Sequence, residues 1–241
     1  ARELEGSGFG PGDEPGGPTF DARFRLTSLE VVSDADTDGD GQEDNHLPDA
    51  LGALDLTLPA QGFALEPFNE RLQANIDTTT PVFVDAHAAG DLALEVMNAT
   101  VEPDGTLRVD EAYAVELRGG FDDAGTFAVG PGDIWIEIVV REGSPSVPVG
   151  LLEAILTGSV DASILTARVH TLISIDEVIE DVIEPSIPPE GWDLDRDGLP
   201  ESKADVMALV GDLAPLLADR ILSDGAPAIS AVLALEGEPG E

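Results

Sequence analysis

The sequence predicts a mainly β fold, an antiparallel β-sandwich-like domain with two or three accessory helices. Apolar and polar residues alternate over most of the chain, as they do in half-buried strands. Apolar residues make up 42% of the 241 residues, which is enough for one packed core. We therefore expect residues 1–19 to be a flexible tether rich in glycine, proline and acid, and residues 20–241 to form a single β-rich domain.

The first strand is expected at residues 20–32, where large apolar residues recur mostly at every second position. The segment LDLTL at 54–58 also alternates and predicts a half-buried strand. Phe68, Leu72 and Ile76 then recur four residues apart, which predicts a short helix.

The middle of the chain predicts a series of antiparallel strands. Val82, Val84 and Ala86 share one strand face, and Pro103-Asp104-Gly105 forms the turn of a hairpin. Trp135 is expected to face away from the isoleucines on either side of it. The expected strands of this region are 82–88, 91–99, 107–109, 112–117, 125–129, 134–140, 149–160 and 164–173.

The alternation stops at Ser174. Ser174 and Glu177 form a capping-box pattern ahead of a helical apolar stripe, and Pro185 follows its end. Apolar residues at helical spacing over 206–221 predict a second helix, which Pro215 should kink. Residues 228–236 predict a last strand.

The charge of the chain excludes several kinds of partner. The formal net charge is -38, from 49 acidic and 11 basic residues, with Lys203 as the single lysine. Such a chain lacks the basic patches that bind nucleic acid or anionic membranes. Excess acid can serve solubility alone, but its self-repulsion also favours bound cations. The chain contains no cysteine for disulfides or thiolate metal sites, and no apolar run long enough for a transmembrane segment.

An acidic loop follows the first expected strand. Its predicted calcium ligands are the carboxylates at relative positions 1, 3, 5 and 9 and the carbonyl at position 7, namely Asp36, Asp38, Asp40, Asp44 and Gln42. Gly41 at position 6 allows the sharp turn that points alternate oxygens at one centre. Position 12 is Leu47 and not the usual glutamate, so Asp49, Asp34, Asn45, water or a more distant residue should complete the shell.

A second acidic loop has the same register. Its predicted ligands, in the same order of positions, are Asp193, Asp195, Asp197, Glu201 and the carbonyl of Leu199. Gly198 occupies position 6, and Asp205, on the first turn of the following helix, is the candidate closing ligand. The calcium loops are thus expected near 34–49 and 193–205.

The segment DTDGDGQEDNHLPD closely resembles thrombospondin type 3 repeats and related DxDxDG, EF-hand-like loops of bacterial surface proteins. DLDRDGLPES resembles the same family and, less closely, half of a dockerin. These resemblances imply calcium ligation by the carboxylates of both loops. The tether, the β-rich middle and the loops together look like uncharacterised secreted lipoproteins of Gram-negative bacteria, which implies a secreted, extracellular or outer-membrane-anchored location.

We therefore expect a calcium-binding structural or assembly protein of the bacterial cell envelope, without catalytic activity. Its partners would be calcium and copies of itself, other surface proteins or glycans. The three histidines lack zinc-type spacing, and no nucleotide-binding or hydrolase motif is present. Two alternatives stay open. One is a carbohydrate-binding or adhesive module, and the other is a secreted hydrolase that uses a carboxylate pair.

Overall fold

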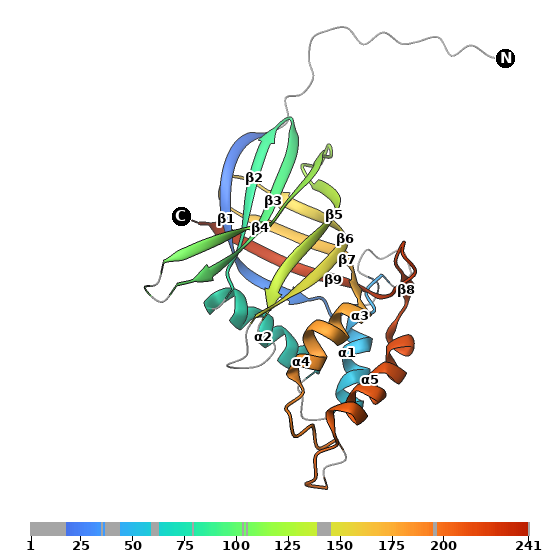
Figure 1. Ribbon diagram of the computed structural model, residues 1–241. Helices are drawn as coiled ribbons and strands as arrows, with labels where there is room; N and C mark the ends of the chain where they lie inside the picture. The colour runs from blue at the N-terminus through green and yellow to red at the C-terminus, as the bar shows by residue number, and fades with distance from the viewer. Residues whose placement is uncertain are drawn as a thin grey trace, which may run out of the picture.

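The computed structural model describes residues 18–34, 36, 44–58, 63–78, 80–102, 104, 106–138, 146–194 and 197–240. Within these residues, nine strands form one antiparallel sheet (Figure 1). The strands are β1 (Thr19–Val31), β2 (Val82–Ala89), β3 (Asp91–Val101), β4 (Leu107–Phe121), β5 (Phe127–Ile138), β6 (Val147–Val160), β7 (Leu165–Ser174), β8 (Arg220–Ile221) and β9 (Pro227–Pro239).

The sheet closes into a barrel of eight strands in the order β1-β2-β3-β4-β5-β6-β7-β9, because β1 pairs with both β2 and β9. The short β8 pairs only with the beginning of β9. The predicted β-sandwich is therefore wrong. Alternation along single strands is the same in a sandwich and a barrel, and the two differ in which distant strands pair.

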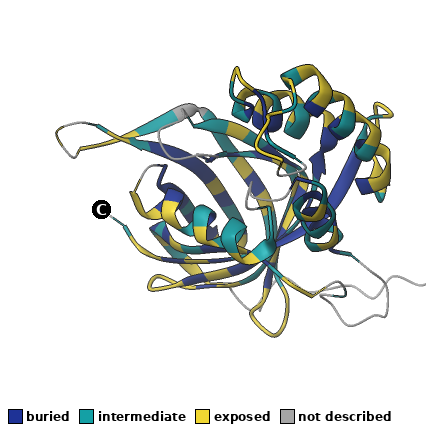
Figure 2. Ribbon diagram, turned by 90° about the horizontal axis from the view of Figure 1, so that it is seen from below, coloured by how far each residue is buried: buried dark blue, intermediate teal, exposed yellow. Residues whose placement is uncertain are grey.

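Apolar side chains fill the barrel. Alternate residues of each strand point inward, and Phe24, Leu94, Leu117, Leu156 and Leu165 are among the fully buried ones. Figure 2 shows this alternation of buried and exposed positions along the strands. Eight-stranded barrels are just wide enough for side chains to fill the inside. The barrel is consequently the hydrophobic core of the protein.

Two helical insertions interrupt the barrel. The first lies between β1 and β2, and the second lies between β7 and β9. Figure 1 shows both insertions at the same end of the barrel. The first insertion contains α1 (Leu47–Thr57) and α2 (Leu65–Thr78), and the second contains α3 (Ile175–Glu177), η1 (Val178–Ile183), α4 (Glu184–Ser186) and α5 (Lys203–Leu217).

The strand predicted at 54–58 is wrong, because Leu54–Thr57 lie in α1. Leu54 and Leu58 are both buried, and residues four apart share one face of a helix. Leu56, which a strand would place beside them, is 86% exposed. The sequence pattern of residues 54–58 therefore fits both a strand and a helix, and the spacing of Leu54 and Leu58 is the helical one.

The other helical predictions are confirmed, with shifted ends. The Ser174 hydroxyl accepts a hydrogen bond from the Glu177 amide at 3.3 Å, as the capping box predicts, although the segment continues as a π-helix and ends after Pro185. Residues 68–76 lie in α2. The helix expected over 206–221 is α5, which contains Pro215 and ends at Leu217. The last predicted strand is part of β9.

The barrel wall has a seam between β4 and β5. In the described residues these strands pair only from Gly119↔Val129 to Phe121↔Phe127. Farther along, the side chain of Asn98 on β3 bridges to β5, donating to the Trp135 carbonyl at 2.7 Å and accepting from the Glu137 amide at 3.3 Å. Asn98-Ala99-Thr100 has the form of an N-glycosylation sequon. Asn98 is only 2% exposed, however, and its side chain has this structural role in the folded chain.

Replacing Asn98 with alanine should destabilise the barrel by about 1–3 kcal/mol, because two part-buried backbone groups of β5 would lose their partners. Urea unfolding would measure this as a lower midpoint with an unchanged slope. The matched control is Thr166→Ala on the exposed face of β7, which should change stability by no more than ~0.5 kcal/mol. Equal effects of the two substitutions would contradict the bridging role of Asn98.

Candidate metal centre

A backbone hydrogen bond joins the two ends of the second acidic loop. The Glu201 amide donates to the Trp192 carbonyl at 2.9 Å, and these two residues form an isolated antiparallel bridge. Trp192 is anchored in the core at 6% exposure. Gly191 adopts a φ of +89°, and a Cβ atom there would collide with the Glu201 carbonyl. The sequence thus permits a tight approach of the two ends of the loop.

The carboxylates of this loop fold back over its own backbone. Asp193 Oδ2 accepts from the Gly198 amide at 3.0 Å, and Asp197 Oδ1 accepts from the Leu199 amide at 2.8 Å. Glu201 Oε2 accepts from the Leu194 amide at 2.6 Å. Three of the predicted ligands therefore belong to one hydrogen-bonded loop. Gly198, at position 6, has a φ of +90°, the conformation that the sharp turn requires.

One carboxylate oxygen among the described residues of this loop differs from the others. Asp193 Oδ1 is buried, and the described residues offer it no hydrogen bond. A buried polar atom without a partner carries the full cost of losing its hydration, about 1–3 kcal/mol and more for a charged group. A cation bound beside Asp193 would remove that cost, because hard divalent ions take carboxylate oxygens as ligands.

The remaining predicted ligands of the second loop have different surroundings. Asp205 lies in the cap of α5, where its carboxylate accepts from the Ser202 hydroxyl at 2.6 Å and its amide donates to the same oxygen at 3.3 Å. The Leu199 side chain is exposed, and its backbone carbonyl is the predicted ligand. Asp195 lies outside the described residues.

Only the ends of the first acidic loop are described. Asp38, Asp40 and Gln42 lie outside the described residues, whereas Asp36 is half-buried and Asp49 is exposed on the first turn of α1. Asp44 lies at the C-terminal end of the loop, and its Oδ2 is 3.8 Å from Nδ1 of His170 on β7. The structure therefore places a histidine beside one predicted ligand, which the sequence spacing did not predict.

Asn45 fastens this loop to the barrel. Its side-chain nitrogen donates to the carbonyls of Val32 and Asp34 at 2.6 and 2.9 Å, and its oxygen accepts from the Val232 amide of β9 at 3.0 Å. The sequence suggested Asn45 only as a possible ligand. Its position beside the aspartates could suggest a loop-closing role, but nothing local identifies Val232 as its partner.

No group of three or more histidine, aspartate or glutamate side chains in the described part of the chain is already arranged to hold a metal ion. The residues searched include Asp193, Asp197 and Glu201 of the second loop, but not the central aspartates Asp38, Asp40 and Asp195. The calcium sites therefore stay a prediction, and the described geometry of the second loop is the part that bears on it most directly.

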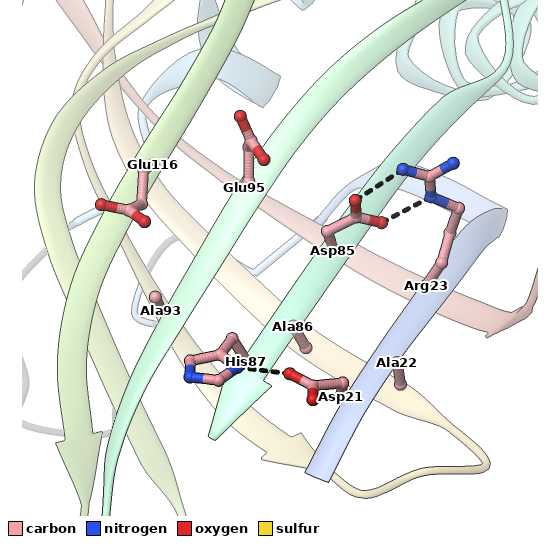
Figure 3. A pocket seen from close by; sticks show the side chains of 9 residues that line it. All are labelled: Asp21, Ala22, Arg23, Asp85, Ala86, His87, Ala93, Glu95 and Glu116. Atoms are coloured by element: carbon pink, nitrogen blue, oxygen red, sulfur yellow. Dashed lines mark hydrogen bonds and ion pairs between the residues drawn. The ribbon is translucent and has the colours of Figure 1, made fainter. Parts of the chain in front are cut away.

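A separate hollow of about 430 Å³ lies on the outer face of β1–β4 (Figure 3). One row of paired residues crosses it from Arg23 through Asp85 and Glu95 to Glu116. Arg23 makes two hydrogen bonds of 2.6 Å to Asp85, which raise the pKa of its guanidinium. His87 in the neighbouring row pairs with Asp21. Since most of these charges are exposed and paired within the wall, the hollow has the properties of a solvated charged surface.

Several acidic side chains lie near Glu177 at the start of the α3–η1 segment. Partial burial raises the pKa of the Glu177 carboxyl, and the neighbouring charges of Asp181, Asp133 and Asp224 raise it further. Glu177 lies over Gly150 of β6, where a Cβ atom would be 3.0 Å from its Oε2. Glu177 is itself an exposed residue, so these effects make its ionisation only somewhat less favourable in the folded protein than in the unfolded chain.

Glu177→Gln should raise the melting temperature at pH 7 by about 1–2 °C. A carboxyl whose pKa is raised on folding favours the folded state below its ordinary pKa of 4.5, and this stability is lost as the pH rises through the raised value. The gain should therefore disappear below pH 4.5. Thermal scans across this range would measure it, with exposed Asp176→Asn as the control for net charge. An equal gain from both substitutions would contradict a local effect.

Comparison with protein-family models, with curated protein sequences and with solved structures finds no significant match. None of the helices in the described residues is both long and apolar enough to cross a membrane. The functional argument consequently depends on the residues and geometry of the chain itself.

Proposed function

We propose that this chain is a non-catalytic, calcium-stabilised structural or binding domain that holds one calcium ion in each acidic loop. The observation that carries the proposal is the buried Oδ1 of Asp193, which has no hydrogen-bond partner in the described residues. It lies in a loop whose other described carboxylates, Asp197 and Glu201, are fixed by backbone amides. A bound calcium ion would give the buried oxygen its partner.

The net charge of -38 supports the same proposal. Folding gathers the acidic residues into a smaller volume, and bound divalent cations reduce the resulting repulsion. Calcium suits the loops better than magnesium because it accepts six to eight oxygens in flexible geometry. Binding to the folded state alone adds about 2.7 kcal/mol per site when calcium is a hundredfold above its Kd. This stabilisation is comparable to that of a disulfide, which a chain without cysteine cannot form.

A location outside the cell follows from the same proposal. Extracellular calcium-binding modules commonly have Kd values of ~10⁻⁴–10⁻³ M, and their sites fill at millimolar calcium. We therefore infer a secreted or cell-envelope protein whose partners are copies of itself or other surface molecules. A glycan-binding role has less support, because Trp192 is buried in the core and cannot stack on a sugar ring. A carboxylate-pair hydrolase is not favoured by any described geometry.

Calorimetry should find two calcium ions per chain, and 1 mM calcium should raise the melting temperature by roughly 1–6 °C per site for Kd values of ~10⁻⁴–10⁻³ M. Asp193→Asn and Glu201→Gln should each weaken one site by about tenfold or more. In chelator, neither substitution should lower the melting temperature, because each removes a repelling charge. The matched control Asp212→Asn, on the exposed side of α5, should keep both sites.

A parent protein that takes up no calcium at millimolar concentration would overturn the proposal. Equal loss of stability in calcium and in chelator on Asp193→Asn would instead assign Asp193 a purely structural role in the loop.

A further inference from the structure

We propose that calcium in the second loop acts as a latch that holds the first turn of α5 closed, an inference that depends on the proposed calcium site. The geometry behind it is the short covalent path from loop to helix. Glu201, a predicted ligand, immediately precedes Ser202, which caps α5 by accepting from the Asp205 amide at 3.3 Å. Any movement of Glu201 therefore moves the helix cap.

The loop is closed by few interactions. The Trp192–Glu201 bridge contributes one hydrogen bond of 2.9 Å, Glu201 adds one to the Leu194 amide at 2.6 Å, and Asp193 Oδ2 accepts one from the Gly198 amide at 3.0 Å. Without a cation, Asp193 Oδ1 stays buried with no partner among the described residues. Opening the loop lets water reach Asp193, so the calcium-free loop has a specific reason to open.

Opening the bridge also releases the beginning of α5. Beyond the cap, this turn is held by an ion pair between Lys203 and Glu184 of α4, 3.1 Å long and partly exposed, which contributes little. The first fully buried contact of α5 is Val206, followed by Val210 one turn later. Local opening can therefore extend over residues 198–205 without disturbing the barrel, at much lower free energy than global unfolding.

The consequence is a calcium-dependent cover at one end of the barrel. Figure 1 shows α5 beside α1 and the α3–α4 segment, below the strands. The buried face of α5 belongs to the same hydrophobic cluster as the barrel interior. Calcium would thus set how often the beginning of this helix lifts from the cluster.

The single lysine makes the proposal measurable. Endoproteinase Lys-C has one possible cleavage site in the chain, after Lys203 in the first turn of α5. The protease needs an extended segment around the cleaved bond, so its rate reports the open population. We expect 1 mM calcium to slow cleavage by about two- to tenfold for Kd values of ~10⁻⁴–10⁻³ M, as expected for a ligand that binds only the closed state. In chelator, sub-denaturing urea should change the rate little, because local opening exposes little surface.

Three variants separate this latch from other effects of calcium. Asp193→Asn should be cleaved in calcium as fast as in chelator. Asp212→Asn, which removes the same charge from the exposed side of α5, should keep the calcium response. Asp38→Asn in the first loop should also keep it. A fluorogenic lysine peptide, cleaved at the same rate with and without calcium, shows that the protease itself is unaffected.

Parallel calorimetry distinguishes the two proposals. Absence of calcium binding would overturn the calcium site itself. Calcium binding with an unchanged cleavage rate, or an undiminished response in Asp193→Asn, would overturn the latch and leave the site standing. A cleavage rate that rises with urea as steeply as global unfolding would also overturn the latch, because the open state would then be the unfolded chain.

Discussion

Closure of the sheet through β1 is the constraint on which the rest of the structure depends. The first half of β1 pairs with β2, the second half pairs with β9, and a register shift between Leu26 and Ser28 bends the strand between them. Without this double pairing, β2 and β9 would be open edges. Closure also fixes where the insertions emerge. Val31 at the end of β1 pairs with Leu233, and Ser174 at the end of β7 pairs with Ala228, so both helical insertions leave the barrel near the beginning of β9.

Hydrogen bonds consequently anchor both insertions to the first half of β9. The Ser230 carbonyl accepts from the His46 amide at 2.9 Å, beside the first acidic loop. The Ser230 amide and hydroxyl donate to Asp219, just after α5, at 2.8 and 2.6 Å. Two residues later, the Val232 amide donates to Asn45. These contacts explain a buried serine in an otherwise apolar strand, because its polar groups hold two segments that are distant in sequence.

The sequence predicted most of the strands because alternation is a local pattern, whereas the calcium loops stay a prediction. Alternation identified β2, β3, β6 and β7, and the spacing of aspartates around Gly198 identified a loop that does turn at that glycine. Closure could not be predicted in the same way, since pairing of β1 with β9 joins segments about 200 residues apart and leaves no local signal. The structural roles of Asn45 and Asn98 were missed for the same reason, because each bonds to a backbone group of a strand distant in sequence. Ser230 was missed because its partners, Asp219 and His46, lie outside the neighbouring strands. The helix α1 was missed because five residues of alternation also fit a helical turn.

The acidic residues of this chain lie in at least two kinds of surroundings, and burial distinguishes them. Asp104, Asp122 and Asp161 each accept the amide two residues ahead and so fix tight turns between strands. The hydroxyl and amide of Thr106 lower the pKa of Asp104, and those of Ser163 lower the pKa of Asp161. These carboxylates are exposed, so water can solvate their remaining oxygen atoms and they need no cation.

Asp193 starts from the same kind of interaction, since its Oδ2 accepts the Gly198 amide. Its other oxygen is buried and without a hydrogen bond in the described residues. Water therefore does not solvate this oxygen as it solvates the exposed turn aspartates. An excess of aspartate in the sequence is therefore not by itself an argument for calcium. The argument comes from Asp193, whose second oxygen is buried in a loop that carries further carboxylates. A bound cation would satisfy both the charge and the geometry of this carboxylate.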